Sequence, residues 1–141
     1  MPTGPDLTVV INTRDRNRLL ERTLHSLSQC DQPPGFRGVL VLENGGTYGA
    51  EAVVRAAPPH LCATYALCPK SGVSATRNYA VERVQHGLIV WLDDDVRLSP
   101  SVLTAYASAA AVVEEPGQGA NPLVLHGPVG TGKTHLLEGI W

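Results

Sequence analysis

Short apolar segments alternate with amphipathic segments along most of this chain. The first apolar segment, residues 7–11, is rich in β-branched side chains and predicts a buried strand. Leu20, Leu24 and Leu27 then recur at the spacing of one helix face. The further predicted elements are strands at residues 38–42, 63–67 and 88–92, and a helix between the last two strands that places Val73, Ala80 and Val84 on one face.

This alternation predicts an α/β fold. Because parallel strands need long crossover connections, it favours a mainly parallel sheet with helices on both faces. After the strand at 88–92, Ser99-Pro100 is suited to a helix start, and we expect a helix of small residues from 102 to 114 or 115. Residues 123–125 predict a short last strand, which can pair only with an edge of the N-terminal sheet or with nothing.

The composition limits the class of protein. A chain of 141 residues with 43% hydrophobic residues is suited to a soluble globular domain. The formal charge of -2 gives no reason to expect strong nonspecific binding of nucleic acid. We find no apolar stretch long enough to span a membrane and no signal peptide. Cys30, Cys62 and Cys68 form no CxxC pair, so we expect reduced thiols and a cytoplasmic location.

Three aspartates directly follow the fourth predicted strand. If the chain stays extended from Leu92 to Asp95, Asp93 and Asp95 point the same way, because alternate side chains of a strand share a face. The carboxyl ends of strands in open α/β sheets are where ligands bind. Two carboxylates there favour a hard divalent cation, Mn²⁺ or Mg²⁺, that can also bridge a diphosphate. The alternative interpretation is a solvated turn before the next helix.

The order of features from residue 7 to residue 95 resembles the nucleotide-binding half of family 2 glycosyltransferases, which have the GT-A fold. The resemblance implies a Rossmann-like sheet that binds a nucleotide-diphospho-sugar, UDP-linked or another, with a divalent metal. Glu43 stands where the family usually has Asp, and Thr76 stands where it has Ala. The matching segments are residues 9–16, the helix with Leu20, Thr23, Leu24 and Leu27, and residues 41–46, 72–78 and 91–95.

The resemblance implies roles at the base end of the nucleotide site. Thr13 and Arg14 would line the pocket of the base, and Glu43 would contact the nucleoside. A plainer interpretation takes Arg14, Arg16 and Arg18 as the solvated start of the first helix, because charged residues are common where a helix begins.

At the phosphate end, the resemblance implies that Arg77 helps to neutralise the diphosphate, that Asp93 approaches the ribose or the metal, and that Asp95 holds the metal. Arg77 as a solvated helix residue is the plainer alternative. The family places its acceptor pocket and its general base, a carboxylate, in a later segment, but here the resemblance ends near Pro100. We therefore expect a chain that binds the donor but is incomplete for sugar transfer, and no catalytic residue is assigned.

A second nucleotide-binding pattern lies near the C-terminus. Residues 127–134 match the phosphate-binding loop called Walker A, GxxxxGK[ST], at every fixed position, after an apolar strand and before a helix. Backbone N–H groups of such a loop converge on phosphate, while its lysine adds charge and its hydroxyl binds Mg²⁺. The predicted ATP-binding set is Gly127, Gly130, Gly132, Lys133 and Thr134. A chance match is the alternative.

Residues 121–137 carry a resemblance to the start of the ATPase domain of DnaA-type bacterial replication initiators, and the resembling segment covers about residues 103–141. No Walker B carboxylates, sensor residues or arginine finger follow, so we do not expect ATP hydrolysis. We divide the chain into an incomplete glycosyltransferase-like domain, 1–101, and an incomplete ATPase-like domain, 102–141, with the junction in a helix that suits either parent.

Three functions stay open at this point. The first is a glycosyltransferase-like protein that binds a sugar nucleotide, and it covers most of the chain. The second is an ATP-binding fragment of a replication initiator, for which Mg²⁺ would be the ion and nucleic acid a partner. The third is a chimeric or truncated reading frame that joins two partial domains and has no finished activity.

Overall fold

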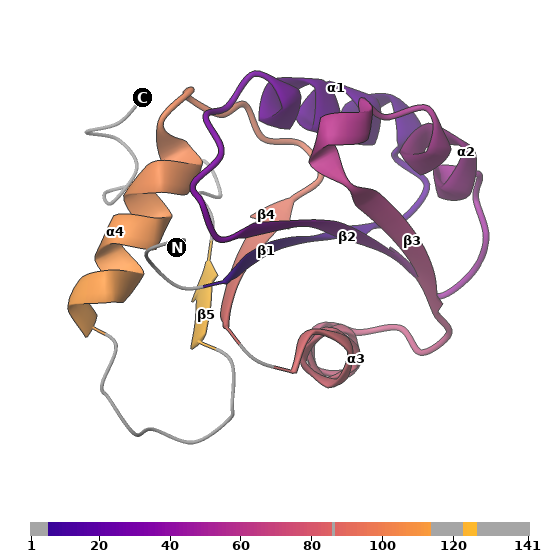
Figure 1. Cartoon of the computed structure of the whole chain (residues 1–141). Helices are drawn as coiled ribbons and strands as arrows, with labels where there is room; N and C mark the ends of the chain where they lie inside the picture. The colour runs from indigo at the N-terminus through magenta and orange to yellow at the C-terminus, as the bar shows by residue number, and fades with distance from the viewer. Residues whose placement is uncertain (1–5, 86, 114–122, 127–141) are drawn as a thin grey trace.

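The computed structural model describes residues 6–85, 87–113 and 123–126. Its strands form one sheet in the order β3-β2-β1-β4-β5, with each pair parallel, and helices cover both faces (Figure 1). The predicted α/β class with a mainly parallel sheet is confirmed. The strands are β1 (Leu7–Thr13), β2 (Phe36–Asn44), β3 (Ala63–Cys68), β4 (Leu88–Asp93) and β5 (Leu123–His126), and the helices are α1 (Asn17–Ser28), α2 (Ala50–Arg55), the short 3-10 helix η1 (Pro59–Leu61), α3 (Val73–Val84) and α4 (Val102–Val113).

Strand β1 lies in the middle of the sheet and contributes to both layers of the core. Leu7, Val9 and Ile11 point to the face that carries α1, α2 and α4. Val10 points to the opposite face, which carries α3. Because both faces are covered, Val9, Val10 and Ile11 form a continuous apolar run in the middle of this strand, as in buried parallel strands.

Helix α1 confirms the periodicity of its sequence. Leu20, Leu24 and Leu27 are buried against the sheet, and Thr23 is buried on the same face. A hydroxyl on a buried face needs hydrogen-bond partners, so Thr23 marks a place where α1 meets a polar part of the structure.

Helix α3 corrects one expectation. Val73 was expected on the buried face with Ala80 and Val84, but it is 63% exposed. Thr76 is the fully buried residue one turn before Ala80, and its hydroxyl donates to the carbonyl of Gly72 at 2.7 Å. The buried face of α3 therefore begins at Thr76, one turn after the start of the helix, because Val73 precedes the part of α3 that packs on the sheet.

The strand order reverses between β1 and β4. The chain leaves β1 toward β2 and leaves β4 toward β5, in opposite directions along the sheet. Asn12 of β1 lies beside Asp93 of β4 in the register of the two strands, so both exits meet at the same edge. Such reversals are where open α/β sheets hold ligands, and the predicted aspartates lie at this one.

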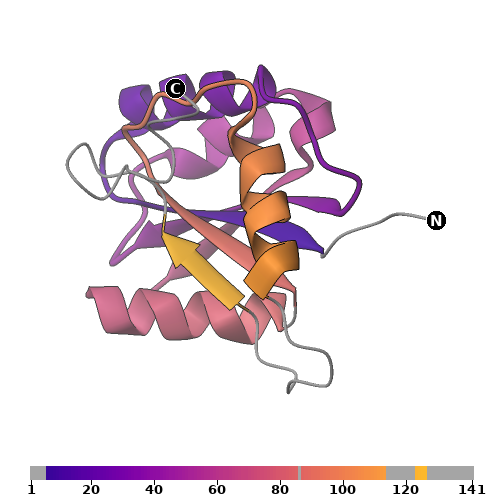
Figure 2. The ribbon, with the colours of Figure 1, turned by 90° about the vertical axis from the view of Figure 1, so that its left-hand side faces the viewer.

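Strand β5 extends the sheet beyond β4 (Figure 2). Leu123 lies beside Leu88, and His126 lies beside Trp91. Of the two possibilities that the sequence left open, the structure has the pairing with the sheet edge. Among the described residues, we find no helix of the length and apolarity that a bilayer span requires. The predicted ATP-binding residues Gly127, Gly130, Gly132, Lys133 and Thr134 lie outside the described residues.

Candidate functional site

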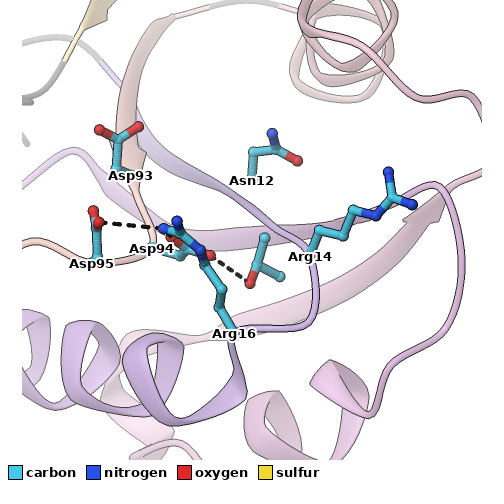
Figure 3. Close-up of a pocket in the computed structure, with 7 residues that line it drawn as sticks. Asn12, Arg14, Arg16, Asp93, Asp94 and Asp95 are labelled. Atoms are coloured by element: carbon cyan, nitrogen blue, oxygen red, sulfur yellow. Dashed lines mark hydrogen bonds and ion pairs between the residues drawn. The ribbon is translucent and has the colours of Figure 1, made fainter.

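A polar hollow of about 340 Å³ lies where β1 and β4 end (Figure 3). Its walls come from the exit of β1 and from the turn that follows β4. The structure brings together four of the predicted site residues there and adds three others. The lining residues are the predicted Thr13, Arg14, Asp93 and Asp95, and the additional Asn12, Arg16 and Asp94.

The three aspartates do not lie on one extended strand. Strand β4 ends at Asp93, and Asp94 and Asp95 form a turn, which corrects the assumption of an extended chain to Asp95. Asp94 points inward and is buried, whereas Asp95 is exposed. In Figure 3 the carboxylate of Asp93 points up from the end of β4, and that of Asp95 lies below it at the turn. Both carboxylates line the hollow, although the extended geometry is absent.

Buried hydrogen bonds fix this turn to β1 and α1. The hydroxyl of Thr13 donates to Oδ2 of Asp94 at 2.8 Å. The hydroxyl of Thr23 donates to the carbonyl oxygen of Asp94 at 2.8 Å, and it accepts from the N–H of Val96 at 3.3 Å. These bonds satisfy polar groups that would otherwise be costly to bury, and they set the position of the aspartates.

Arg16 links two of the carboxylates. Its Nη1 donates to Oδ1 of Asp94 at 3.1 Å and to Oδ2 of Asp95 at 3.3 Å. Arg16 is the N-cap residue of α1, and it follows Asp15, whose φ of 54° lies in the left-handed region. The hydrogen bond and charge of Asp94, followed by the charge of Asp95, raise the pKa of Arg16, so the guanidinium stays charged.

Arg14 extends to the other side of the hollow, away from Asp95 (Figure 3). Its guanidinium carbon lies 5.7 Å from the centre of the Tyr48 ring, within the range of a cation–π contact. It also lies beside Gly45, where an added Cβ would be 3.4 Å from Nη1 of Arg14. Neither Arg14 nor Arg16 is therefore simply the solvated start of a helix.

Glu43 does not line the hollow. Its Oε2 accepts the N–H groups of Tyr48 at 2.8 Å and Ala50 at 3.1 Å, and its Oε1 accepts the hydroxyl of Tyr65 at 2.6 Å. Burial, with the hydrogen bond from Tyr65 to Glu43, raises the pKa of Tyr65 to about 12. Glu43 thus shapes the loop of residues 45–50, on which Arg14 packs.

Arg77 lies on the exposed side of α3, outside the set of residues that line the hollow. Sequence reasoning did not assign a site role to Asp94 or Arg16. One signal was present for Asp94, because Thr13 continues the alternation of Val9 and Ile11 toward a buried face. A hydroxyl at such a position requires a polar partner, and the aspartates at the neighbouring strand end were the candidates.

The hollow fits a divalent cation only in part. Among the residues that the structure describes, no group of three or more His, Cys, Asp or Glu side chains is arranged to hold a metal ion. Mg²⁺-like ions are commonly bound by one or two carboxylates and completed by substrate phosphates and water. Asp93 and Asp95 fit a cation whose remaining ligands are water molecules or the phosphates of a bound nucleotide.

Two family models match overlapping parts of the chain. The model described as glycosyl transferase family 2 matches residues 8–112. The model described as the bacterial DnaA ATPase domain matches residues 94–141. Residues 94–112 belong to both matches, and they contain Asp95 and most of α4.

Two solved structures share the fold. The mannosyltransferase PcManGT from Pyrobaculum calidifontis, in complex with GDP-Man and Mn²⁺, matches with a TM-score of 0.65 and 25% identity over 84% of this chain and 36% of that chain. TarS from S. aureus matches with a TM-score of 0.64 and 19% identity over 76% of this chain and 20% of that chain. The predicted Rossmann-like GT-A fold is confirmed.

Curated relatives that match are replication initiators. DnaA of Nautilia profundicola is 51% identical over 43 residues, which are 30% of this chain and 10% of that protein. DnaA of Thermomicrobium roseum is 36% identical over 76 residues, which are 53% of this chain and 16% of that protein. The chain thus spans about a tenth of the length of the first of these relatives. Both resemblances found in the sequence are confirmed.

Proposed function

This chain belongs to glycosyl transferase family 2, and from that membership we propose that its polar hollow binds a nucleoside-diphosphate sugar together with a divalent cation. One observation carries the proposal: Asp93 and Asp95 line the same hollow at the reversal of strand order. The mannosyltransferase of similar fold holds GDP-Man and Mn²⁺, so GDP joins UDP as a nucleotide to test.

Different residues of the hollow contact different parts of the ligand in this proposal. Asp95 binds the cation, and Asp93 approaches the ribose or the cation. The cation stabilises negative charge on the diphosphate when it is bound. Arg14, on the far side of the hollow from Asp95, lines the place of the base, and the ring of Tyr48 lies against its guanidinium. Arg77 lies outside the hollow on the exposed side of α3, and its proposed role is to neutralise charge of a diphosphate that extends beyond the hollow.

Thr13 and Glu43 act on the ligand indirectly, through the backbone segments that they hold in place. The Thr13 hydroxyl is engaged with Asp94, so Thr13 acts by fixing the turn that carries Asp95, across the hollow from the place of the base. Glu43 is engaged with Tyr48, Ala50 and Tyr65, so its effect on the nucleoside passes through the loop that carries Tyr48. These roles differ from the direct contacts that the family resemblance implies.

Calorimetry tests the binding proposal. We expect UDP or GDP to bind more tightly with Mn²⁺ than without it. Asp95→Ala should remove the metal-dependent part of the affinity and leave the fold intact, because this side chain is exposed. Asp31→Ala, at an exposed aspartate outside the hollow, is the matched control and should bind like the unchanged chain. Equal affinity of the unchanged chain for both nucleotides with and without Mn²⁺ would refute the proposal.

We propose donor binding without efficient sugar transfer. The carboxylates after Asp95 are Glu114, Glu115 and Glu138, and none lies in a segment that resembles the family's general base. We expect the purified chain, given GDP-mannose or a UDP-sugar and an acceptor, to transfer sugar far more slowly than about one turnover per second. A faster rate in a product assay would mean that a base exists at a position not assigned above.

The second candidate function is ATP binding by the C-terminal segment. The DnaA match over residues 94–141 and the Walker A pattern at 127–134 favour it. A thermal-shift comparison of UDP with Mn²⁺ against ATP with Mg²⁺ separates the two candidates. Stabilisation by ATP that disappears in Lys133→Ala would favour this second candidate, with nucleic acid as the expected partner.

A further inference from the structure

The positively charged guanidinium of Arg16 already pairs with two of the carboxylates in the hollow. Nη1 of Arg16 lies 3.1 Å from Oδ1 of Asp94 and 3.3 Å from Oδ2 of Asp95. We propose that Arg16 is the resting counter-ion of this pair, that it releases Asp95 when a divalent cation binds, and that its guanidinium then turns to the diphosphate. This inference rests on the proposed function, in which Asp95 is the cation ligand.

The two contacts of Arg16 differ in how easily they open. The carboxylate of Asp94 is 6% exposed, and its other oxygen is held by Thr13, so its position is fixed. The carboxylate of Asp95 is 45% exposed, and its contact with Arg16 is the longer one. Ion pairs between half-exposed side chains contribute little, because water screens them. Asp95 is therefore the partner that Arg16 can release.

The backbone keeps Arg16 at the hollow, whichever partner its side chain has. The carbonyl of Arg16 accepts the N–H of Leu20 at 2.9 Å, which anchors the residue to the first turn of α1. The side chain is 52% exposed and can change direction without losing a buried position. Because a guanidinium fork fits phosphate oxygens as well as carboxylate oxygens, a diphosphate in the same hollow is a suitable second partner.

This arrangement couples the cation to the nucleotide. A cation that binds alone must displace a guanidinium, which then lacks one of its two anionic partners. A cation that binds with a diphosphate provides the displaced guanidinium with a new partner. Each ligand therefore raises the affinity of the other, and by linkage the two factors are equal. Arg16 increases this coupling factor and lowers the affinity for the cation alone.

The test is a titration of the full chain with Mn²⁺ alone, followed by calorimetry. We expect Arg16→Gln to bind Mn²⁺ about fivefold more tightly than the unchanged chain, which is the scale of a lost half-exposed ion pair. Arg18→Gln removes the same charge from a nearby exposed position of α1 outside the hollow, and it should change the affinity by less than about twofold. The charge of the chain is thus matched between the two variants.

A second measurement separates release from a merely structural role. The titration with Mn²⁺ is repeated at saturating GDP or UDP, and the ratio of the two affinities gives the coupling factor. We expect a smaller factor in Arg16→Gln than in the unchanged chain. A structural role would change both affinities in proportion and leave the factor unchanged. Arg16→Lys keeps the charge without the fork, and it should give intermediate values for both quantities.

The outcomes distinguish this inference from the proposed function. Metal-dependent nucleotide binding by the unchanged chain, with no gain in Mn²⁺ affinity in Arg16→Gln, overturns the inference alone. If Arg16→Gln does not fold, Arg16→Lys decides, and an unchanged affinity for Mn²⁺ overturns the inference. A gain in Mn²⁺ affinity with no nucleotide binding by any variant supports the counter-ion role but refutes the proposed function.

Discussion

Strands β1 and β5 belong to the same sheet but are held in different ways. β1 pairs with β2 and β4 along its length, and Leu7, Val9 and Ile11 are fully buried. β5 has four residues and joins the sheet by its pairing with β4. The hollow with the aspartates lies at the end of β1, so the candidate site is built on the part of the sheet that has most support.

The connections between the strands show the same contrast. Two connections, β1–α1–β2 and β2–α2–β3, move toward the β3 edge of the sheet, and their helices lie on one face. The connection β3–α3–β4 moves in the opposite direction, and its helix lies on the other face. These three connections therefore have the same hand. β4–α4–β5 also steps back, but Leu103 and Tyr106 of α4 lie in the core on the α1 face, so this connection has the opposite hand.

The exception lies at the connection that leaves the overlap of the two family matches, residues 94–112. Crossover connections in parallel sheets share one hand in about 98% of cases, so a connection of the opposite hand is unusual. Helix α4 lies within both family matches except at its end, whereas β5 lies inside the DnaA match and outside the glycosyl transferase match. This contrast predicts firm support around the turn after β4 and weaker support at β5, and two variants and one exchange measurement test the two regions.

The largest effect is expected at Asp94, inside the well-supported region. Asp94→Ala leaves the buried hydroxyl of Thr13 and the guanidinium of Arg16 without this partner. We expect a loss of about 2–3 kcal/mol, because the buried Thr13 hydroxyl loses its acceptor, whereas water can solvate the exposed guanidinium of Arg16. Urea unfolding measures the loss. Asp95→Ala should cost less than about 1 kcal/mol, because its partner contact is exposed. Equal losses would show that the buried position of Asp94 is unimportant.

A smaller effect is expected at Thr23, which ties α1 to the turn. Thr23→Val keeps the shape of the side chain but removes the hydroxyl that serves the carbonyl of Asp94 and the N–H of Val96. We expect a loss of about 1–2 kcal/mol in the free energy of unfolding. Thr104→Val, which removes a more exposed hydroxyl from α4, is the control and should change stability by less than about 0.5 kcal/mol. An equal change in both variants would contradict the role of Thr23.

Local patterns predicted β1 to β4 because each is a short apolar run whose burial follows from its own residues. They could not place Asp94, because its partners Thr13 and Thr23 are 81 and 71 residues away in sequence. Those contacts turn the chain after Asp93, which no alternation of side chains indicates. The expected burial of Val73 was wrong for a related reason. Helical spacing predicts which side of the helix a residue lies on, but it does not predict where packing on the sheet begins.

The smallest free energies of local opening are expected at β5, and hydrogen exchange can measure them. A strand of four residues that has one neighbour among the described strands can open without disturbing the rest of the sheet, and its connection has the rarer hand. We therefore expect the amides of residues 123–126 to exchange through local openings, at least about 2 kcal/mol more easily than those of residues 9–12 in β1. Mass spectrometry of peptides that cover the two strands gives both values in one experiment, so β1 serves as the internal control. Equal protection would make β5 an integral strand and remove the contrast. If that protection rose with ATP and Mg²⁺ and this rise disappeared in Lys133→Ala, β5 would instead belong to a working phosphate-binding segment, and the second candidate function would become the better one.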